Sequence, residues 1–158
     1  DDCKKLWRDH RVSVRNCVDL ALLARSVDGR WKGPYNGGIG LSRLVEIYLE
    51  RNLPKGRIRR SNWETELSTQ QKQYAANDCH STLAIYQTLI SRALNLATVP
   101  ESEYFTFDAI KGVLRDNEGR PWFPFNPRYE PEEPGQGQQG QSQGQGRQGQ
   151  EESTLSNI

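Results

Sequence analysis

The sequence predicts an α/β domain rich in helix, followed by a C-terminal tail that does not fold. Three observations carry this prediction: an alternating segment at 12–19, two segments with helical apolar spacing at 41–51 and 69–94, and a tail of glycine and glutamine. Alternation with a period of two is typical of a strand, whereas steps of three and four residues indicate one face of a helix.

The N-terminal elements are short. Residues 3–10 (CKKLWRDH) predict the end of a short helix, and residues 12–19 (VSVRNCVD) predict a strand. Asp19 is a suitable N-cap for the apolar turn LALLAR, because its carboxylate accepts the free N–H groups of a first helical turn. Residues 29–40 (GRWKGPYNGGIG) are rich in glycine, but no Gly-Lys-Ser/Thr follows. We therefore predict a connecting loop there and not a phosphate-binding loop.

Two longer helices follow. Residues 41–51 carry apolar side chains at three- and four-residue steps and predict an amphipathic helix, which Pro54 ends. Ser68 and Gln71 match the S-x-x-Q capping box, which predicts a long helix running to about residue 95. The apolar stripe that we expect to face inward on this helix consists of Ala75, Cys79, Leu83, Tyr86 and Ile90, with Ile85 and Leu89 beside it.

The C-terminal part of the chain divides into two segments. Residues 96–130 combine aromatic residues with prolines, as in PWFPFNPRY, and we predict an extended arm laid over the surface of a domain. The stretch 131–150 has no aliphatic or aromatic side chain to bury. Such a stretch cannot offset the entropy of ordering its backbone, about 1–2 kcal/mol per residue, so residues 131–158 are predicted to be disordered. The domain itself is then expected to occupy residues 1–95.

Composition excludes several classes of protein. The net charge is +1, so overall charge does not indicate a nucleic-acid partner. Cys3, Cys17 and Cys79 form no C-x-x-C pair, which argues against a disulfide framework or a zinc site and predicts free thiols in a reducing, intracellular compartment, either nucleus or cytoplasm. No apolar run approaches the length of a membrane span. The chain contains no methionine and begins at Asp1, so we expect a fragment, a processed product or an incomplete gene record.

The segment Tyr74-Ala75-Ala76-Asn77-Asp78 is the most informative site. Tyr74 and Asp78 are four residues apart, so they share one face of the predicted helix. Asp78 lies at the edge of the stripe expected to face inward, where an ionised carboxylate is costly unless it is paired or binds a metal. Taken alone, the pair also fits an ordinary surface aspartate beside a packed tyrosine.

A set of ordered motifs decides between these interpretations. The sequence reads GLSRLVEIYLERNLPKGRIRRSNW from Gly40, then a short spacer, then LSTQQKQYAANDCHSTLAIYQTLI. This pattern resembles the tyrosine subgroup of the DEDD 3′–5′ exonuclease superfamily, to which ribonuclease D and the Werner syndrome exonuclease domain belong. The shared elements are an S-L-x-x-L-V-type helix, a basic loop, S-[DN]-W, L-[ST]-x-x-Q, Y-A-A-x-D and a following L-x-x-L helix. The resemblance covers residues 2–95 and implies a ribonuclease-H-like fold whose first strands would precede Asp1.

The resemblance also implies roles for individual residues. Asp78 matches the metal-binding aspartate of the third exonuclease motif, and Tyr74 matches its tyrosine. Gln73 stands where the other subgroup has histidine, which favours the tyrosine type. Asp2, in DCKKL, resembles the metal-binding aspartate at the end of the second motif, and Asp1 takes that role if the register differs by one.

The implied reaction is phosphodiester hydrolysis with two Mg²⁺ or Mn²⁺ ions, in which Tyr74 orients the attacking water. The family supplies four carboxylates, two of them from a D-x-E motif on its first strand. This sequence has no D-x-E in a strand context, and Glu64-x-Glu66 lies in a predicted loop. The chain thus keeps two of the four ligands, and we expect little or no nuclease activity from it alone.

The basic loop at Lys55, Arg57, Arg59 and Arg60 is either a solvated run of charge or a contact for phosphates. The resemblance favours phosphate contact with a DNA or RNA partner and little base specificity. Trp63 is predicted to pack rather than to stack on a base.

The alternative function is a catalytically dead remnant that binds nucleic acid or protein. If the first strands are missing, the two amphipathic helices lack a covering sheet. We then expect exposed apolar side chains at Leu44, Tyr48, Leu83 and Tyr86.

Overall fold

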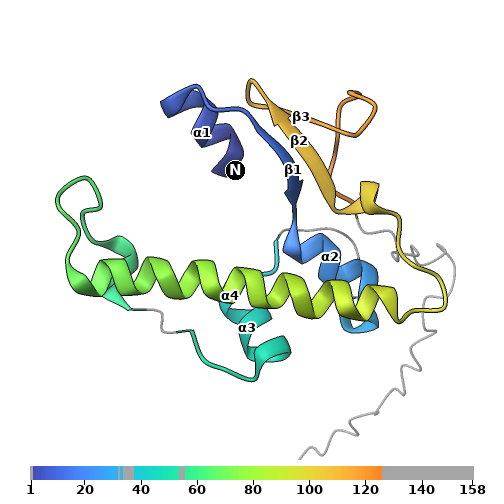
Figure 1. Ribbon diagram of the computed structural model, residues 1–158, viewed down its shortest axis with the longest axis horizontal. Helices are drawn as coiled ribbons and strands as arrows, with labels where there is room; N and C mark the ends of the chain where they lie inside the picture. The colour runs from blue at the N-terminus through green and yellow to red at the C-terminus, as the bar shows by residue number, and fades with distance from the viewer. Residues whose placement is uncertain (1, 32, 34–37, 54–55, 126–158) are drawn as a thin grey trace, which may run out of the picture.

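The computed structural model describes residues 2–31, 33, 38–53 and 56–125, with the long helix α4 crossing the molecule and a small sheet to one side of it (Figure 1). In chain order the elements are α1 Asp2–His10, β1 Val14–Val18, α2 Leu20–Val27, η1 Gly29–Trp31, α3 Leu41–Leu49, η2 Arg57–Arg60, α4 Thr69–Leu94, η3 Ser102–Tyr104, β2 Thr106–Ile110 and β3 Val113–Arg115. The predicted mixed α/β class is confirmed. The tail at 131–158, Asp1 and Lys55 lie outside the described residues.

Side-chain caps set where α2 and α4 begin. The Asp19 carboxylate accepts from the N–H of Ala21 at 2.9 Å and of Leu22 at 3.0 Å. The Ser68 hydroxyl accepts from the Gln71 N–H at 3.3 Å, and the Gln71 side chain accepts from the Ser68 N–H at 2.8 Å. Both predicted N-caps are confirmed, and each satisfies N–H groups that have no partner within a helix.

Over residues 96–125, the part of the segment 96–130 that the structure describes, the chain is not the extended arm that the sequence predicts. It contains a hairpin of β2 and β3, and β2 also pairs antiparallel with β1 to give the sheet order β1-β2-β3. Lys111 and Gly112 turn the hairpin with φ of 51° and 76°, the backbone that two-residue hairpin turns require. The sequence pattern does not predict these strands, because they are only five and three residues long and because their partner β1 lies far away in the chain.

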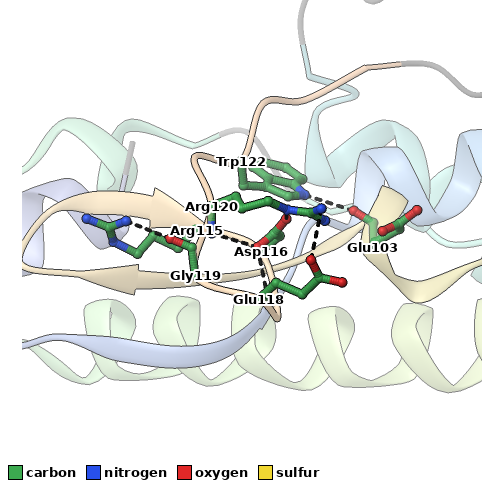
Figure 2. Close-up of polar contacts among 7 residues, drawn as sticks. All are labelled: Glu103, Arg115, Asp116, Glu118, Gly119, Arg120 and Trp122. Atoms are coloured by element: carbon green, nitrogen blue, oxygen red, sulfur yellow. Dashed lines mark hydrogen bonds and ion pairs between the residues drawn. The ribbon is translucent and has the colours of Figure 1, made fainter.

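A polar turn after β3 returns the chain to the sheet (Figure 2). The Asp116 carboxylate accepts from the N–H of Arg120 at 2.8 Å and from its guanidinium at 2.7 Å. Trp122 then stacks on Phe107, with ring centroids 4.6 Å apart, and its indole N–H donates to the Glu103 carbonyl at 2.8 Å. Trp122 is buried, so this segment contributes to the core.

The core lies where α2, α3 and α4 meet. Its fully buried large side chains are Leu22, Leu23, Leu44, Val45, Ile85 and Leu89. Leu44 and Tyr48, which we expected to lack cover, are buried because α3 packs directly on α4. The expectation that α3 would be uncovered is therefore wrong.

The inward face of α4 is not the predicted stripe. Ile85, Leu89 and Ala93 are buried, whereas Leu83 is 55% exposed and Tyr86 is 37% exposed. Two apolar stripes run along this helix, and α2 and α3 cover only one of them. The spacing of apolar residues could not show which stripe the neighbouring helices take.

A polar cluster around Asp28 joins α2, α3 and α4. Its carboxylate accepts from the Tyr48 hydroxyl at 3.0 Å and pairs with Arg30 at 3.0 Å and with Arg92 at 3.7 Å. The Tyr48 hydroxyl also accepts from the Trp31 indole at 2.8 Å. Burial raises the pKa of Asp28, but hydrogen bonds from the Arg30 amide and Tyr48 hydroxyl, with the Arg30 charge, outweigh burial and leave that pKa below its ordinary value.

This lowered pKa predicts a specific loss of stability in acid. A carboxylate with a lowered folded pKa stabilises the fold above its unfolded pKa, about 3.9, and that contribution disappears as pH falls through the folded pKa. We expect Asp28→Asn to lower the free energy of unfolding by about 1–2 kcal/mol at pH 7 and to flatten its fall between pH 5 and 3. Urea denaturation across this range tests it, with Glu46→Gln, in an exposed ion pair, as control. If the free energy of unfolding fell with pH in the same way for Asp28→Asn and wild type, the lowered pKa of Asp28 would be contradicted.

Candidate active site

Asp78 occupies a half-buried position on α4, and one of its oxygens has an unusual environment. Its Oδ1 atom is buried, and no hydrogen-bond donor contacts it in the part of the chain that the structure describes. Residues on the next turns of the same face, Ser81 and Ile85, are buried. Packing of α4 on α2 and α3 therefore fixes the carboxylate in place without supplying a proton donor for Oδ1.

Tyr74 lies one helical turn before Asp78. Partial burial raises the pKa of the Tyr74 phenol, and the nearby carboxylate of Asp78 raises this pKa further, against an opposing effect of Arg59. The Tyr74 ring packs against Trp63, with centroids 6.0 Å apart and planes tilted by 59°. The structure thus brings Tyr74 close to both Asp78 and Trp63, and Trp63 packs on a side chain, although it stays 36% exposed.

Asp2 lies in the first turn of α1 and is exposed. It lines an open hollow of about 440 Å³, and Asp78 lines a second one of about 570 Å³. The two hollows share Val18, Leu20 and Thr82. The two aspartates thus lie on different helices along adjoining hollows, but Tyr74 lines neither of them.

The basic residues Arg57, Arg59 and Arg60 form the short helix η2, and all three are exposed. Within the described residues, none of them is paired with a carboxylate. Gln71 anchors the following segment, because its amide donates to the Ser61 hydroxyl at 3.0 Å and to the Asn62 carbonyl at 2.7 Å. The start of α4 therefore holds the basic segment close enough for Arg59 to influence Tyr74.

The donor set fits a divalent cation only in part. Carboxylate oxygens are the ligands that Mg²⁺ and Mn²⁺ prefer, and the unpartnered Oδ1 of Asp78 is a suitable one. Among residues 2–31, 33, 38–53 and 56–125, however, no three His, Cys, Asp or Glu side chains gather in a group that could hold a metal ion. The two carboxylates of Asp2 and Asp78 would be too few to hold two ions.

Asn16, which the sequence predicts only as a strand residue, also belongs to this region. It lines the hollow beside Asp78 and has a left-handed backbone with φ of 53°. Its N–H donates to the Asp108 carboxylate at 2.8 Å, which fixes an irregular step in β1. Asparagine tolerates positive φ better than most residues, and this was the available signal.

No helix in the described part of the chain is both long and apolar enough to cross a membrane.

Comparison with known proteins places this chain in a family. A curated Arabidopsis thaliana protein named 3′–5′ exonuclease is 38% identical over 93 residues, covering 56% of this chain and 30% of that protein. Proteins named exonuclease 3′–5′ domain-containing protein 2 are 34% identical in mouse and 35% identical in Drosophila melanogaster, covering 57% and 56% of this chain and 14% of each relative. The chain thus spans less than a third of the length of these relatives. No solved structure matches it. The family model described as 3′–5′ exonuclease matches residues 1–93, more than half of the sequence, and the chain belongs to this family.

Proposed function

We propose that residues 1–95 are the C-terminal part of a ribonuclease-H-like 3′–5′ exonuclease domain of the tyrosine subgroup. In the parent protein this domain would hydrolyse phosphodiester bonds of DNA or RNA. The observation that carries the proposal is the buried Oδ1 of Asp78, which has no donor among the described residues. A buried carboxylate oxygen without a partner is costly, and a bound cation removes that cost.

Two residues of this chain would hold the metal, Asp78 and Asp2. Bound Mg²⁺ or Mn²⁺ supplies polarisation of water and of phosphate oxygens in hydrolases of this kind. The remaining carboxylates must come from outside the described residues. We place them in a D-x-E segment that precedes Asp1 in the parent protein, which is consistent with the greater length of the curated relatives.

Tyr74 would orient the attacking water and would not remove its proton. An unperturbed tyrosine has a pKa near 10, and the surroundings of Tyr74 raise its pKa further. The phenol therefore stays protonated at neutral pH and can donate a hydrogen bond. Its position one turn from Asp78 suits this role.

The arginines of η2 would contact the phosphate backbone. Arg57, Arg59 and Arg60 are exposed and have no carboxylate partner in the described part of the chain, so their charges are available to a polyanion. Such contacts bind without reading bases, so binding should weaken steeply with salt.

A second function is favoured for this chain taken alone. The described residues hold no group of three metal ligands. Without further carboxylates, the same surface would bind nucleic acid or another protein and would not catalyse hydrolysis.

Metal binding tests the assignment of Asp78. We expect the 158-residue chain to bind at most one Mn²⁺, with a dissociation constant of about 10⁻⁴ to 10⁻³ M, measured by the electron paramagnetic resonance signal of free Mn²⁺. Asp78→Asn should weaken binding by about tenfold or more. Glu66→Gln, which removes an exposed charge in the loop before α4, is the matched control and should bind as wild type does. Equal binding by Asp78→Asn and wild type would remove Asp78 from the site.

A further inference from the structure

Two cysteines far apart in the sequence are close in space. Cys3 lies in the first turn of α1 and Cys17 lies in β1, and their sulfur atoms are 3.7 Å apart. Both are free thiols and half-buried. The sequence spacing predicts free thiols, and the fold brings two of the three into contact.

The pair depends on an irregular step in β1. Val14 lies opposite Ala109 and Cys17 lies opposite Phe107, so two residues of β1 between these pairs lie opposite a single residue of β2. This bulge places Cys17 on the same face of the sheet as Phe107, where both line the hollow that also contains Cys3. The left-handed backbone of Asn16 and its bond to Asp108 hold the bulge in place.

The helix that carries Cys3 is held loosely. None of the residues of α1 is buried. Its Trp7 packs against Gly112 in the hairpin turn, where an added Cβ would lie 3.0 Å from the indole ring. The sulfur contact joins the opposite, N-terminal end of α1 to β1, next to Asp2. Disulfide formation requires α1 to move toward β1, so that the sulfurs close from 3.7 Å to about 2.0 Å, the length of a disulfide bond.

We propose that Cys3 and Cys17 form a reversible intramolecular disulfide that fixes α1 against β1. The disulfide would tie the N-terminal turn of α1 to the sheet and order the segment between them. That it also fixes Asp2 for metal binding rests on the proposed function, whereas formation of the disulfide itself does not.

The oxidant that this step needs is a small disulfide such as oxidised glutathione. The Cys3 thiolate attacks one glutathione sulfur and releases the other glutathione as thiolate, which gives a mixed disulfide. Cys17 then loses its proton and attacks the sulfur of Cys3, and the second glutathione leaves. The two cysteine thiols are oxidised, and one oxidised glutathione becomes two reduced molecules.

The surroundings of the two cysteines support an order in which Cys3 reacts first and Cys17 second. The open hollow of about 440 Å³ gives a small oxidant access to both sulfurs. Burial, a hydrogen bond with Cys3 and the charges of Cys3 and Asp108 raise the pKa of Cys17 to about 11. A thiol with a raised pKa is a slow first attacker, so Cys17 suits the second step, which takes place within the molecule.

Thiol trapping and hydrogen exchange test the proposal. The full chain with Cys79→Ser, which removes the exposed third thiol, is equilibrated with mixtures of reduced and oxidised glutathione and quenched with N-ethylmaleimide. We expect peptide mass mapping to show the Cys3–Cys17 disulfide exceeding mixed glutathione disulfides by about tenfold, because proximity favours the intramolecular product. Amide exchange in α1 should slow by about tenfold in the oxidised chain and recover with dithiothreitol.

Cys3→Ser and Cys17→Ser in the same background are the controls, with circular dichroism to confirm that each folds. Both should take up at most one glutathione, and oxidation should leave the exchange of α1 unchanged. Accumulation of mixed disulfides without the Cys3–Cys17 bond would overturn the proposal. So would a disulfide that leaves the exchange of α1 unaltered. Neither readout uses metal or nuclease activity, so failure here is distinct from failure of the proposed function.

Discussion

With Mn²⁺ and a 5′-labelled single strand of DNA or RNA, we expect the 158-residue chain to release no nucleotide from the 3′ end. In-line attack in this class of hydrolase needs two ions about 3.5–4 Å apart. Asp2 and Asp78 lie along adjoining hollows, and no group of three potential metal ligands exists among the described residues. If Asp2 and Asp78 are the carboxylates that this chain supplies, they would not position both ions, and we expect the attacking water to stay unactivated.

Extending the chain upstream should restore the activity. If the coding sequence before Asp1 supplies a D-x-E segment, we expect the longer protein to shorten the strand from its 3′ end. Asp78→Asn in the longer protein should lower the rate by about 10³-fold, as the loss of a charge-stabilising group in an active site typically does. Tyr74→Phe should have a smaller effect, about 10²-fold, because it removes one orienting hydroxyl. Glu66→Gln is again the control.

Two outcomes would contradict the proposal that this chain needs upstream carboxylates to act as an exonuclease. Metal-dependent shortening by the 158-residue chain, abolished by Asp78→Asn, would mean that its ligand set is complete without D-x-E. A longer protein that binds the DNA strand and the RNA strand but shortens neither would favour the alternative function, a catalytically dead remnant that binds nucleic acid. Polyacrylamide gels of the labelled products distinguish these cases, because stepwise 3′ shortening gives a ladder.

The sequence predicted the local features of the fold well. The caps at Asp19 and Ser68 depend on a side chain and the N–H groups two or three residues away, so a short window contains all the information. The proximity of Tyr74 to Asp78 is likewise a property of helical spacing.

Long-range features could not be predicted in the same way. The hairpin of β2 and β3 is specified by pairing with β1, and 92 residues separate Asn16 from Asp108, which bond across that pair. The contact of Cys3 with Cys17 depends on a bulge in β1 and on the placement of α1. The unpartnered Oδ1 of Asp78 also depends on tertiary packing.

Replacing Leu89 and Leu83 separately should give very different losses of stability, although both are leucines on α4. Leu89 is fully buried between α4 and the neighbouring helices, whereas Leu83 is 55% exposed. Leu89→Ala removes buried methyl groups and leaves a cavity, so we expect it to lower the free energy of unfolding by about 2–5 kcal/mol. Net stabilities of domains are about 5–15 kcal/mol, so this change could unfold a marginal chain. Leu83→Ala should change it by about 0.5 kcal/mol or less.

Urea denaturation followed by circular dichroism measures both losses, and a hydrophobic dye reports the exposed face. Leu83 and Tyr86 line the same open hollow as Asp78, so this apolar surface is accessible to a dye. We expect Leu83→Ala to reduce dye fluorescence without loss of helix. A loss of stability from Leu83→Ala as large as that from Leu89→Ala would show that this face is covered in solution. If that loss grows with protein concentration, a second copy of the chain provides the cover, because dissociation and unfolding are then linked.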